Sequence, residues 1–240
     1  PLELTPLADA RVAPQLTFMQ NIIKGACGLC LQEKDLLNSH IIPRFTFKNI
    51  KRSSGGIMWS LSDKDPVKVT KDKPYKEPLL CRDCDSGILG PMDKYFSDFL
   101  YNEIGVKRER NDNFVYLENV SSLKLKGFVI GTLFRMHLTT KPLFDIVDLG
   151  AKHSEKIRKK LLEGIEFVDD EFPITITIPM YKGKFYDDMF LEPDMIREFG
   201  NRIYRFIVSG VLFAVHVGSK KVSVRSATLL TGSDGERGGW

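Results

Sequence analysis

Cysteine is scarce in this sequence, with four in 240 residues, and the charges nearly balance at a formal net of +4. A compact DNA-binding module is usually more basic, so this charge permits nucleic-acid contact without requiring it. Long apolar runs are absent: the longest, over 127–134, falls well short of the roughly 20 residues of a membrane helix. Residues 1–14 have neither the basic nor the apolar region of a signal peptide, so we expect a cytoplasmic protein without a membrane partner.

The composition that is present is ordinary for a globular protein, with 42% hydrophobic and 28% charged residues. A chain of 240 residues allows one large domain or two small ones with a buried core. We divide it into an extended, proline-rich arm over residues 1–20, a domain over 21–110 that contains all four cysteines and an α+β domain over 111–240.

The cysteines form two Cys-x-x-Cys pairs, Cys27 with Cys30 and Cys81 with Cys84. Thiolates at this spacing can hold a metal ion from one turn, and a structural zinc site takes four ligands. In a reducing compartment the pattern favours Zn²⁺ over two disulfides or four free thiols. An iron site of the rubredoxin type would use the same ligands and is kept as an alternative.

The periodicity of apolar residues after the second cysteine pair predicts an α+β fold, with helices followed by an antiparallel sheet. Pro91 suits the first turn of a helix rich in aromatic residues, and Gly164 suits the end of a lysine-rich helix. Ser209-Gly210 separates two β-rich runs, as the turn of a hairpin would. The predicted elements are a helix that includes Pro91, helices over about 121–138 and 151–163, strands over 174–178, 202–208 and 211–217, and a long loop or exposed hairpin over 51–78.

The segment between the cysteine pairs carries a further motif. Asn38-Ser39-His40-Ile41-Ile42-Pro43-Arg44-Phe45 follows the first pair, and Leu79-Leu80-Cys81-Arg82-Asp83-Cys84-Asp85 contains the second. Together they resemble the HNH endonuclease superfamily, especially a bacterial subgroup with Ser-His-Ile-Ile-Pro before a Leu-Leu-Cys-x-x-Cys knuckle. The resemblance covers roughly residues 25–105, under half of the chain.

The resemblance implies a zinc-stapled ββα-metal unit of the treble-clef type that hydrolyses DNA phosphodiester bonds. In that family the histidine before Ile-Ile-Pro is the general base, so His40 is the candidate here. A divalent ion, Mg²⁺ or Mn²⁺, would offset charge on the scissile phosphate. By position Asp85 is the candidate ligand of that ion, and Ser39 stands where an acidic residue commonly precedes the histidine.

Departures from the family pattern leave two hypotheses open. The Ser39 hydroxyl is a poor ligand for a hard cation, and Lys76-Glu77 stands near the position of the family's middle Asn. Gly90-Pro91 is expected to interrupt the metal-binding helix. The first hypothesis is a metal-dependent HNH-type endonuclease, working as one subunit of a bacterial or phage system. The second is a non-catalytic, zinc-stapled subunit that binds nucleic acid or protein through a degenerate HNH site.

Basic residues that follow His40 are the candidates for phosphate contact. We expect Lys51, Arg52 and Arg44 to touch the backbone of DNA, the expected partner. The predicted C-terminal sheet carries no motif, and we expect it to form core and an interface for a protein partner. The sequence does not indicate an oligomeric state.

Overall fold

A computed structural model describes most of the chain, and no helix in the described part is long and apolar enough to span a membrane. The predicted arm, Lys51 and Arg52 lie outside that part. The described residues are 23–48, 57–61, 66–70, 75–102, 107–110, 115–118, 120–168, 170–181, 184–198, 200–218 and 230–231.

The first cysteine pair lies in the loop of a β-hairpin. Strand β1 (Ile23–Ala26) pairs antiparallel with β2 (Glu33–His40), which pairs antiparallel with β5 (Lys76–Cys81). The β1–β2 loop folds back over this sheet, because the Gly28 N–H donates to the Leu79 carbonyl of β5 at 3.0 Å. The second cysteine pair begins where β5 ends, so the sheet brings both pairs to one place.

The chain becomes helical directly after β5 and stays helical through Gly90 and Pro91. π-helical turns over Asp83–Leu89 (η3) lead into α2 (Gly90–Ser97), and further π turns over Asp98–Asn102 (η4) follow. The interruption expected at Gly90-Pro91 is therefore wrong. The Gly90 N–H still donates in π register, to the Asp85 carbonyl, and Pro91 stands where the register changes to α, at N1/N2 of the new helix. A missing proline N–H is tolerated at such a position.

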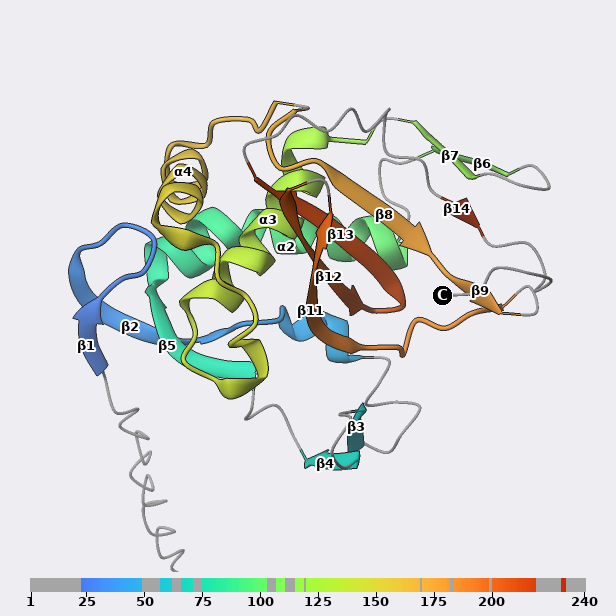
Figure 1. The fold of residues 1–240 in the computed structure, drawn as a ribbon. Helices are drawn as coiled ribbons and strands as arrows, with labels where there is room; N and C mark the ends of the chain where they lie inside the picture. Colours follow the sequence, from blue (N-terminus) through green and yellow to red (C-terminus); the bar gives the residue numbers. More distant parts are fainter. Residues whose placement is uncertain are drawn as a thin grey trace, which may run out of the picture.

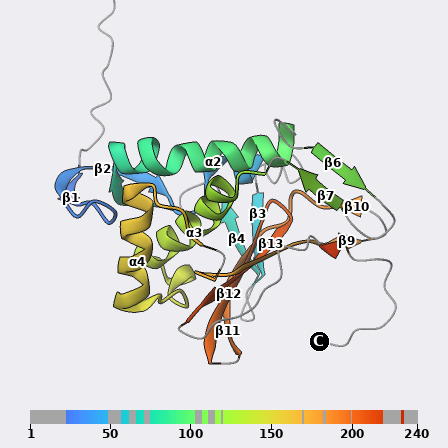
Figure 2. The same cartoon turned by 90° about the horizontal axis from the view of Figure 1, so that it is seen from above.

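Two further helices confirm the predicted ones. Helix α3 (Ser122–Leu138) is capped by Ser121, whose hydroxyl accepts from the Lys124 N–H at 3.4 Å. Helix α4 (Gly150–Glu163) ends at Gly164, whose φ of 65° lies in the left-handed region that favours glycine. The short 3-10 turn η5 (Pro142–Phe144) lies between them. Figure 2 shows α2, α3 and α4 grouped together beside the C-terminal strands.

The C-terminal strands form one sheet in the order β11-β12-β13-β8-β14, which is antiparallel except for the β14–β8 pair. The predicted hairpin is present as β12 and β13, and φ is positive at both turn residues, 51° at Ser209 and 74° at Gly210. The predicted strand over 174–178 is β8. The strands are β8 (Ile174–Ile178), β11 (Leu191–Glu198), β12 (Asn201–Val208), β13 (Val211–Val217) and β14 (Leu230–Thr231).

Shorter elements complete the described structure. The 3-10 turn η1 (Arg44–Phe47) follows the Ile-Ile-Pro segment. The short strands pair as β3 (Ile57–Leu61) with β4 (Pro66–Thr70), β6 (Lys107–Arg110) with β7 (Val115–Glu118), and β9 (Met180–Tyr181) with β10 (Lys184–Phe185). Strands β3 and β4 form a hairpin within the predicted segment 51–78, while residues 76–78 belong to β5.

One hydrophobic core contains residues from both sides of position 110. The ring of Phe96 on α2 stacks on that of Phe128 on α3, with centroids 4.1 Å apart. Phe213 of β13 meets these two rings edge-on, at 5.6 and 6.1 Å. Helices α2 and α3 therefore lie between the cysteine-bearing sheet and the C-terminal sheet (Figure 1). The division at residue 110 stays a prediction.

Candidate functional site

The four cysteines come together as predicted. Their Sγ atoms all lie within 4.8 Å of one another, and those of Cys30 and Cys81 are 3.9 Å apart. A tetrahedron with Zn–S distances of about 2.3 Å has edges of about 3.8 Å. All four residues are free thiols, unlike in the disulfide alternative. The cluster is thus compatible with a structural metal ion such as zinc.

The loop that carries the first pair is fixed by backbone contacts and by packing. The Leu31 N–H donates to the Cys27 carbonyl at 2.8 Å, and the Cys27 N–H donates to the Gln32 carbonyl at 3.0 Å. Gly28 packs closely against α3, because a Cβ there would lie 2.6 Å from a methyl carbon of Leu138. Backbone hydrogen bonds and packing against α3 therefore both define the shape of the loop.

Hydrogen bonds to sulfur lower the pKa of one thiol. Burial raises the pKa of Cys27, but N–H groups of Cys30, Cys81 and Leu29 outweigh it and bring the pKa to about 7. Burial raises the pKa of both Cys81 and Cys84. A metal ion binds thiolates, so loading this site releases protons and becomes weaker in acid.

His40 and Ser39 lie at the end of β2. His40 is half-buried, and its Nε2 atom is shielded from solvent. Ser39 is buried, and its hydroxyl lies 3.3 Å from the Leu37 carbonyl and also interacts with the Asp85 carboxylate. Because neighbouring strand residues point to opposite faces, Asp85 lies on the Ser39 face of β2 and not on the His40 face.

Asp85 is half-buried and lies beside two buried polar residues, Ser39 and Arg135. Burial raises the pKa of its carboxyl group, and the nearby charge of Asp93 acts in the same direction. Arg135 and the Ser39 hydroxyl lower that pKa, but only in part. Asp85 therefore already has a cationic neighbour and a hydroxyl neighbour within the protein.

That cationic neighbour comes from α3 and is itself buried. The Arg135 guanidinium donates to both carboxylate oxygens of Asp93 on α2, at 2.7 and 2.9 Å, and 3% of its side chain is exposed. Burial acts to lower the pKa of Arg135, but attraction and hydrogen bonding to Asp93, together with attraction to Asp85, raise it. Arginine stays protonated in proteins, so this positive charge is permanent.

The residues near the family's Asn position hold β5 in place. Lys76 and Glu77 pair in register with His40 and Ser39. The Glu77 carboxylate accepts from the Thr140 N–H at 3.0 Å and its hydroxyl at 2.7 Å, and also from the Thr139 hydroxyl. Glu77 thus ties β5 to the end of α3.

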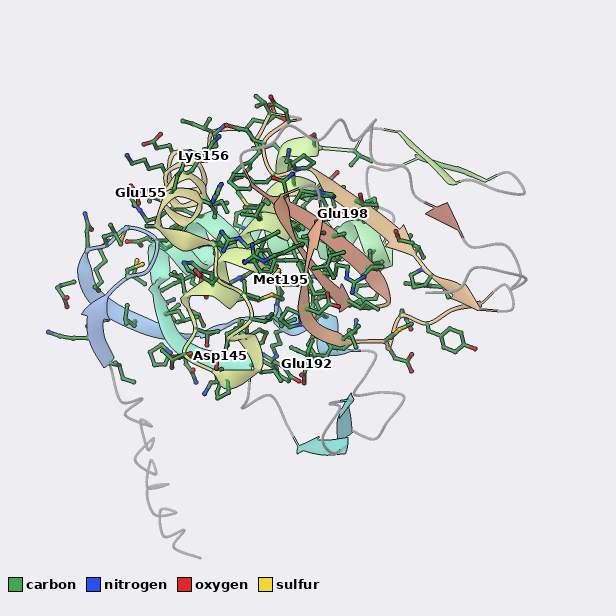
Figure 3. The ribbon with its side chains drawn as sticks, viewed as in Figure 1. Asp145, Glu155, Lys156, Glu192, Met195 and Glu198 are labelled. Atoms are coloured by element: carbon green, nitrogen blue, oxygen red, sulfur yellow. The ribbon has the colours of Figure 1, made fainter. Side chains whose placement is uncertain are left out.

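Arg44 is exposed at the start of η1, and Lys51 and Arg52 lie outside the described residues. The basic face of α4 is largely neutralised by acidic partners. Glu155 and Lys156 extend from this helix in Figure 3. The ion pairs are Lys156–Glu171 at 2.7 Å, Arg158–Glu155 at 2.7 Å, Lys159–Glu155 at 3.5 Å, and Lys160–Glu171.

Sequence reasoning missed Arg135 and Asp93. The available signal was a charged residue inside the helix over 121–138, next to the apolar residues Leu133 and Met136. A buried arginine requires a carboxylate partner. Nothing local, however, identifies a partner 42 positions away.

Comparison with known proteins identifies no relative of this chain. No protein-family model matches the chain, and neither a curated protein nor a solved structure matches it. The conclusions about this chain therefore depend on its own residues. These show a mixed α+β fold with a four-cysteine cluster that is compatible with zinc.

Proposed function

We propose that this chain is a zinc-stapled protein on an HNH-like, treble-clef frame, and that it binds a partner instead of cleaving DNA. One observation carries this choice. The buried Arg135 guanidinium is the cation that acts on Asp85, the carboxylate which the resemblance assigns to a catalytic divalent ion.

The zinc part of the proposal is supported by the donor set. Four sulfur atoms at tetrahedral spacing suit zinc, and a hard cation such as Mg²⁺ prefers oxygen. An iron site would use the same sulfur atoms and is recognised by its colour. The two cysteine pairs come from the β1–β2 loop and from the end of β5, so the ion would join two separate segments.

The supply of oxygen ligands argues against a catalytic divalent ion. Mg²⁺ usually needs one or two carboxylates in near-octahedral geometry. Both oxygens of Asp93 are engaged by Arg135, and Asp85 interacts with Ser39 and with the same guanidinium. An ion at Asp85 would therefore be repelled by the fixed positive charge of the buried Arg135, which solvent and salt screen less than a surface charge.

An HNH-type nuclease is the second candidate, and one observation favours it. Asp85 contacts Ser39, the residue next to His40, so the candidate ligand and the candidate base lie at the same end of β2. On this alternative the ion would bind Asp85 despite the nearby Arg135 charge, and His40 would activate water.

Plasmid nicking by the purified full chain in Mg²⁺ and Mn²⁺ separates the two candidates. We expect wild type and His40→Ala to be equally inactive, with the same metal content, since His40 is not one of the four sulfur ligands. General-base catalysis contributes about 10²- to 10⁴-fold. Metal-dependent nicking that His40→Ala lowers by that amount would establish the nuclease and refute the binding proposal.

A thermal-shift titration gives a second readout that does not depend on activity. A ligand that binds only the folded state raises its stability. Added Mg²⁺ or Mn²⁺ should leave the melting temperature of the zinc-loaded protein unchanged. A saturable rise that Asp85→Asn removes would contradict the proposal. Salt-dependent binding of DNA in the same buffer would identify nucleic acid as the partner, and its absence would favour a protein.

A further inference from the structure

A side chain of α4 reaches the loop that carries the first cysteine pair. Arg158 Nη1 donates to the backbone carbonyl of Leu29 at 2.8 Å, across 129 positions of sequence. Leu29 is fully buried and lies between Cys27 and Cys30. Figures 1 and 2 place α4 at the same end of the molecule as the β1–β2 hairpin. The contact therefore joins the C-terminal half to the metal centre.

We infer that Arg158 is a positioning residue of this centre, which keeps the Cys27–Cys30 loop in its ligating shape and offsets the negative charge of the metal–thiolate group. The inference rests on the proposed zinc site. Partners of this kind, one step removed from the ligands, orient the ligands and tune affinity for the metal.

The guanidinium is itself held in place by Glu155. Arg158 Nε donates to Glu155 Oε2 at 2.7 Å, and Nη2 donates to Glu155 Oε1 at 2.9 Å. Only 14% of the Arg158 side chain is exposed. Such a two-point pair fixes the plane of the guanidinium, which leaves Nη1 aimed at Leu29. Little side-chain freedom remains to be lost when the metal binds.

Charge gives Arg158 a second role. Four thiolates and one Zn²⁺ carry a net charge of −2, and Arg158 is attracted to the Cys30 sulfur. Lys34 is also attracted to Cys30 and Cys81, but it is exposed and pairs with Asp83 at 2.9 Å. The more buried Arg158 is screened less by solvent and salt. It is therefore the cation with the stronger effect on the centre.

The test compares Arg158→Met with the matched control Lys159→Met. Lys159 is the adjacent residue, also pairs with Glu155, and is 60% exposed. Full-length proteins are loaded with Co²⁺, whose tetrathiolate absorption reports the site directly, and are then titrated with a chelator. We expect Arg158→Met to weaken metal binding by about 10- to 100-fold and Lys159→Met to match wild type. Arg158→Lys keeps the positive charge but loses the planar guanidinium with its several N–H donors. Its metal affinity should therefore lie between those of Arg158→Met and Lys159→Met.

Wild-type metal affinity in Arg158→Met would overturn the inference. If Arg158→Met does not fold, Glu155→Gln becomes the test variant. It keeps Arg158 but weakens the two-point pair that holds the guanidinium in place. It should weaken metal binding more than Lys159→Met does, and equal affinities would overturn the inference. Wild-type protein that binds neither Co²⁺ nor Zn²⁺ would refute the zinc proposal itself, an outcome distinct from a variant that binds normally.

Discussion

Arg135 of α3 and Asp93 of α2 form a buried ion pair joined by two hydrogen bonds, at 2.7 and 2.9 Å. The pair connects the helix that follows the second cysteine pair to the helix in contact with the C-terminal sheet. It also places a permanent positive charge near Asp85. The pair thus links the packing of the helices to the function proposed for the site.

Removing the acid of this pair should destabilise the protein strongly. Asp93→Asn removes the carboxylate that is hydrogen-bonded to the buried Arg135, and breaking such a buried pair costs about 3–5 kcal/mol. The control is Lys94→Met, which breaks the exposed Lys94–Asp98 pair on the same helical segment and should cost at most about 1 kcal/mol. Urea unfolding of both variants measures the difference. Equal losses would show that the Arg135–Asp93 pair is screened like a surface pair.

The aromatic stack between α2 and α3 should be needed for the stability of both halves. Phe96 is fully buried, and its ring lies 4.1 Å from that of Phe128. Phe96→Ala should reduce the free energy of unfolding by about 3–5 kcal/mol. The change in protein fluorescence and the release of the metal, followed in one urea titration, should have the same urea midpoint. If the metal were retained after the C-terminal sheet had unfolded, the two halves would be independent.

Loss of one cysteine should remove the metal and lower stability. Cys81→Ser leaves three thiol ligands, and metal-binding free energy contributes to folding free energy in such sites. Zinc content should fall below one ion per chain, and the melting temperature should drop. Wild type treated with a chelator is the control and should show the same lower melting temperature. Full zinc content with an unchanged melting curve in the variant would contradict the proposal that the four cysteines hold a stabilising zinc ion.

Glu171 should make stability depend on pH in acid. Burial alone would raise its pKa, but hydrogen bonds from Lys156, Lys160 and the Val168 N–H lower it from 4.5 to about 2. Between these values the folded state binds fewer protons than the unfolded state, so falling pH favours unfolding. The stability advantage of wild type over Glu171→Gln should therefore be full above pH 4.5 and shrink toward pH 2.

The comparison of the two proteins cancels the metal contribution, because protonation of the cysteines affects both alike. Urea midpoints at several pH values supply the measurement. A difference between wild type and Glu171→Gln that stays constant from neutral pH to pH 2 would show that the Lys156 and Lys160 contacts do not stabilise the ionised carboxylate.

The features that sequence predicted well have local signals. Cys-x-x-Cys spacing identified the four cysteines that cluster, Ser121 marked the start of α3, and Gly164 marked the end of α4. The Ser209-Gly210 turn marked the hairpin, because positive φ at both turn residues suits that connection. Each of these signals lies within a few residues of the feature that it predicts.

The features that sequence could not predict arise from contacts between distant residues. Arg135 finds Asp93 across 42 positions, and Arg158 finds Leu29 across 129, so neither contact leaves a periodic pattern. Helical backbone through Gly90-Pro91 depends on the preceding π turns, and no residue pattern in this sequence marked them in advance. The position of Asp85 on the Ser39 face followed from these arrangements and not from its spacing after Cys84.

The central claim is that the two cysteine pairs share one zinc ion. The most direct test is native mass spectrometry of the purified full chain together with elemental analysis. We predict one zinc per chain, and four cysteines that a thiol reagent modifies only after a chelator removes the ion. Metal-free protein with four reactive thiols, a mass that shows disulfides, or bound iron in place of zinc would contradict the claim.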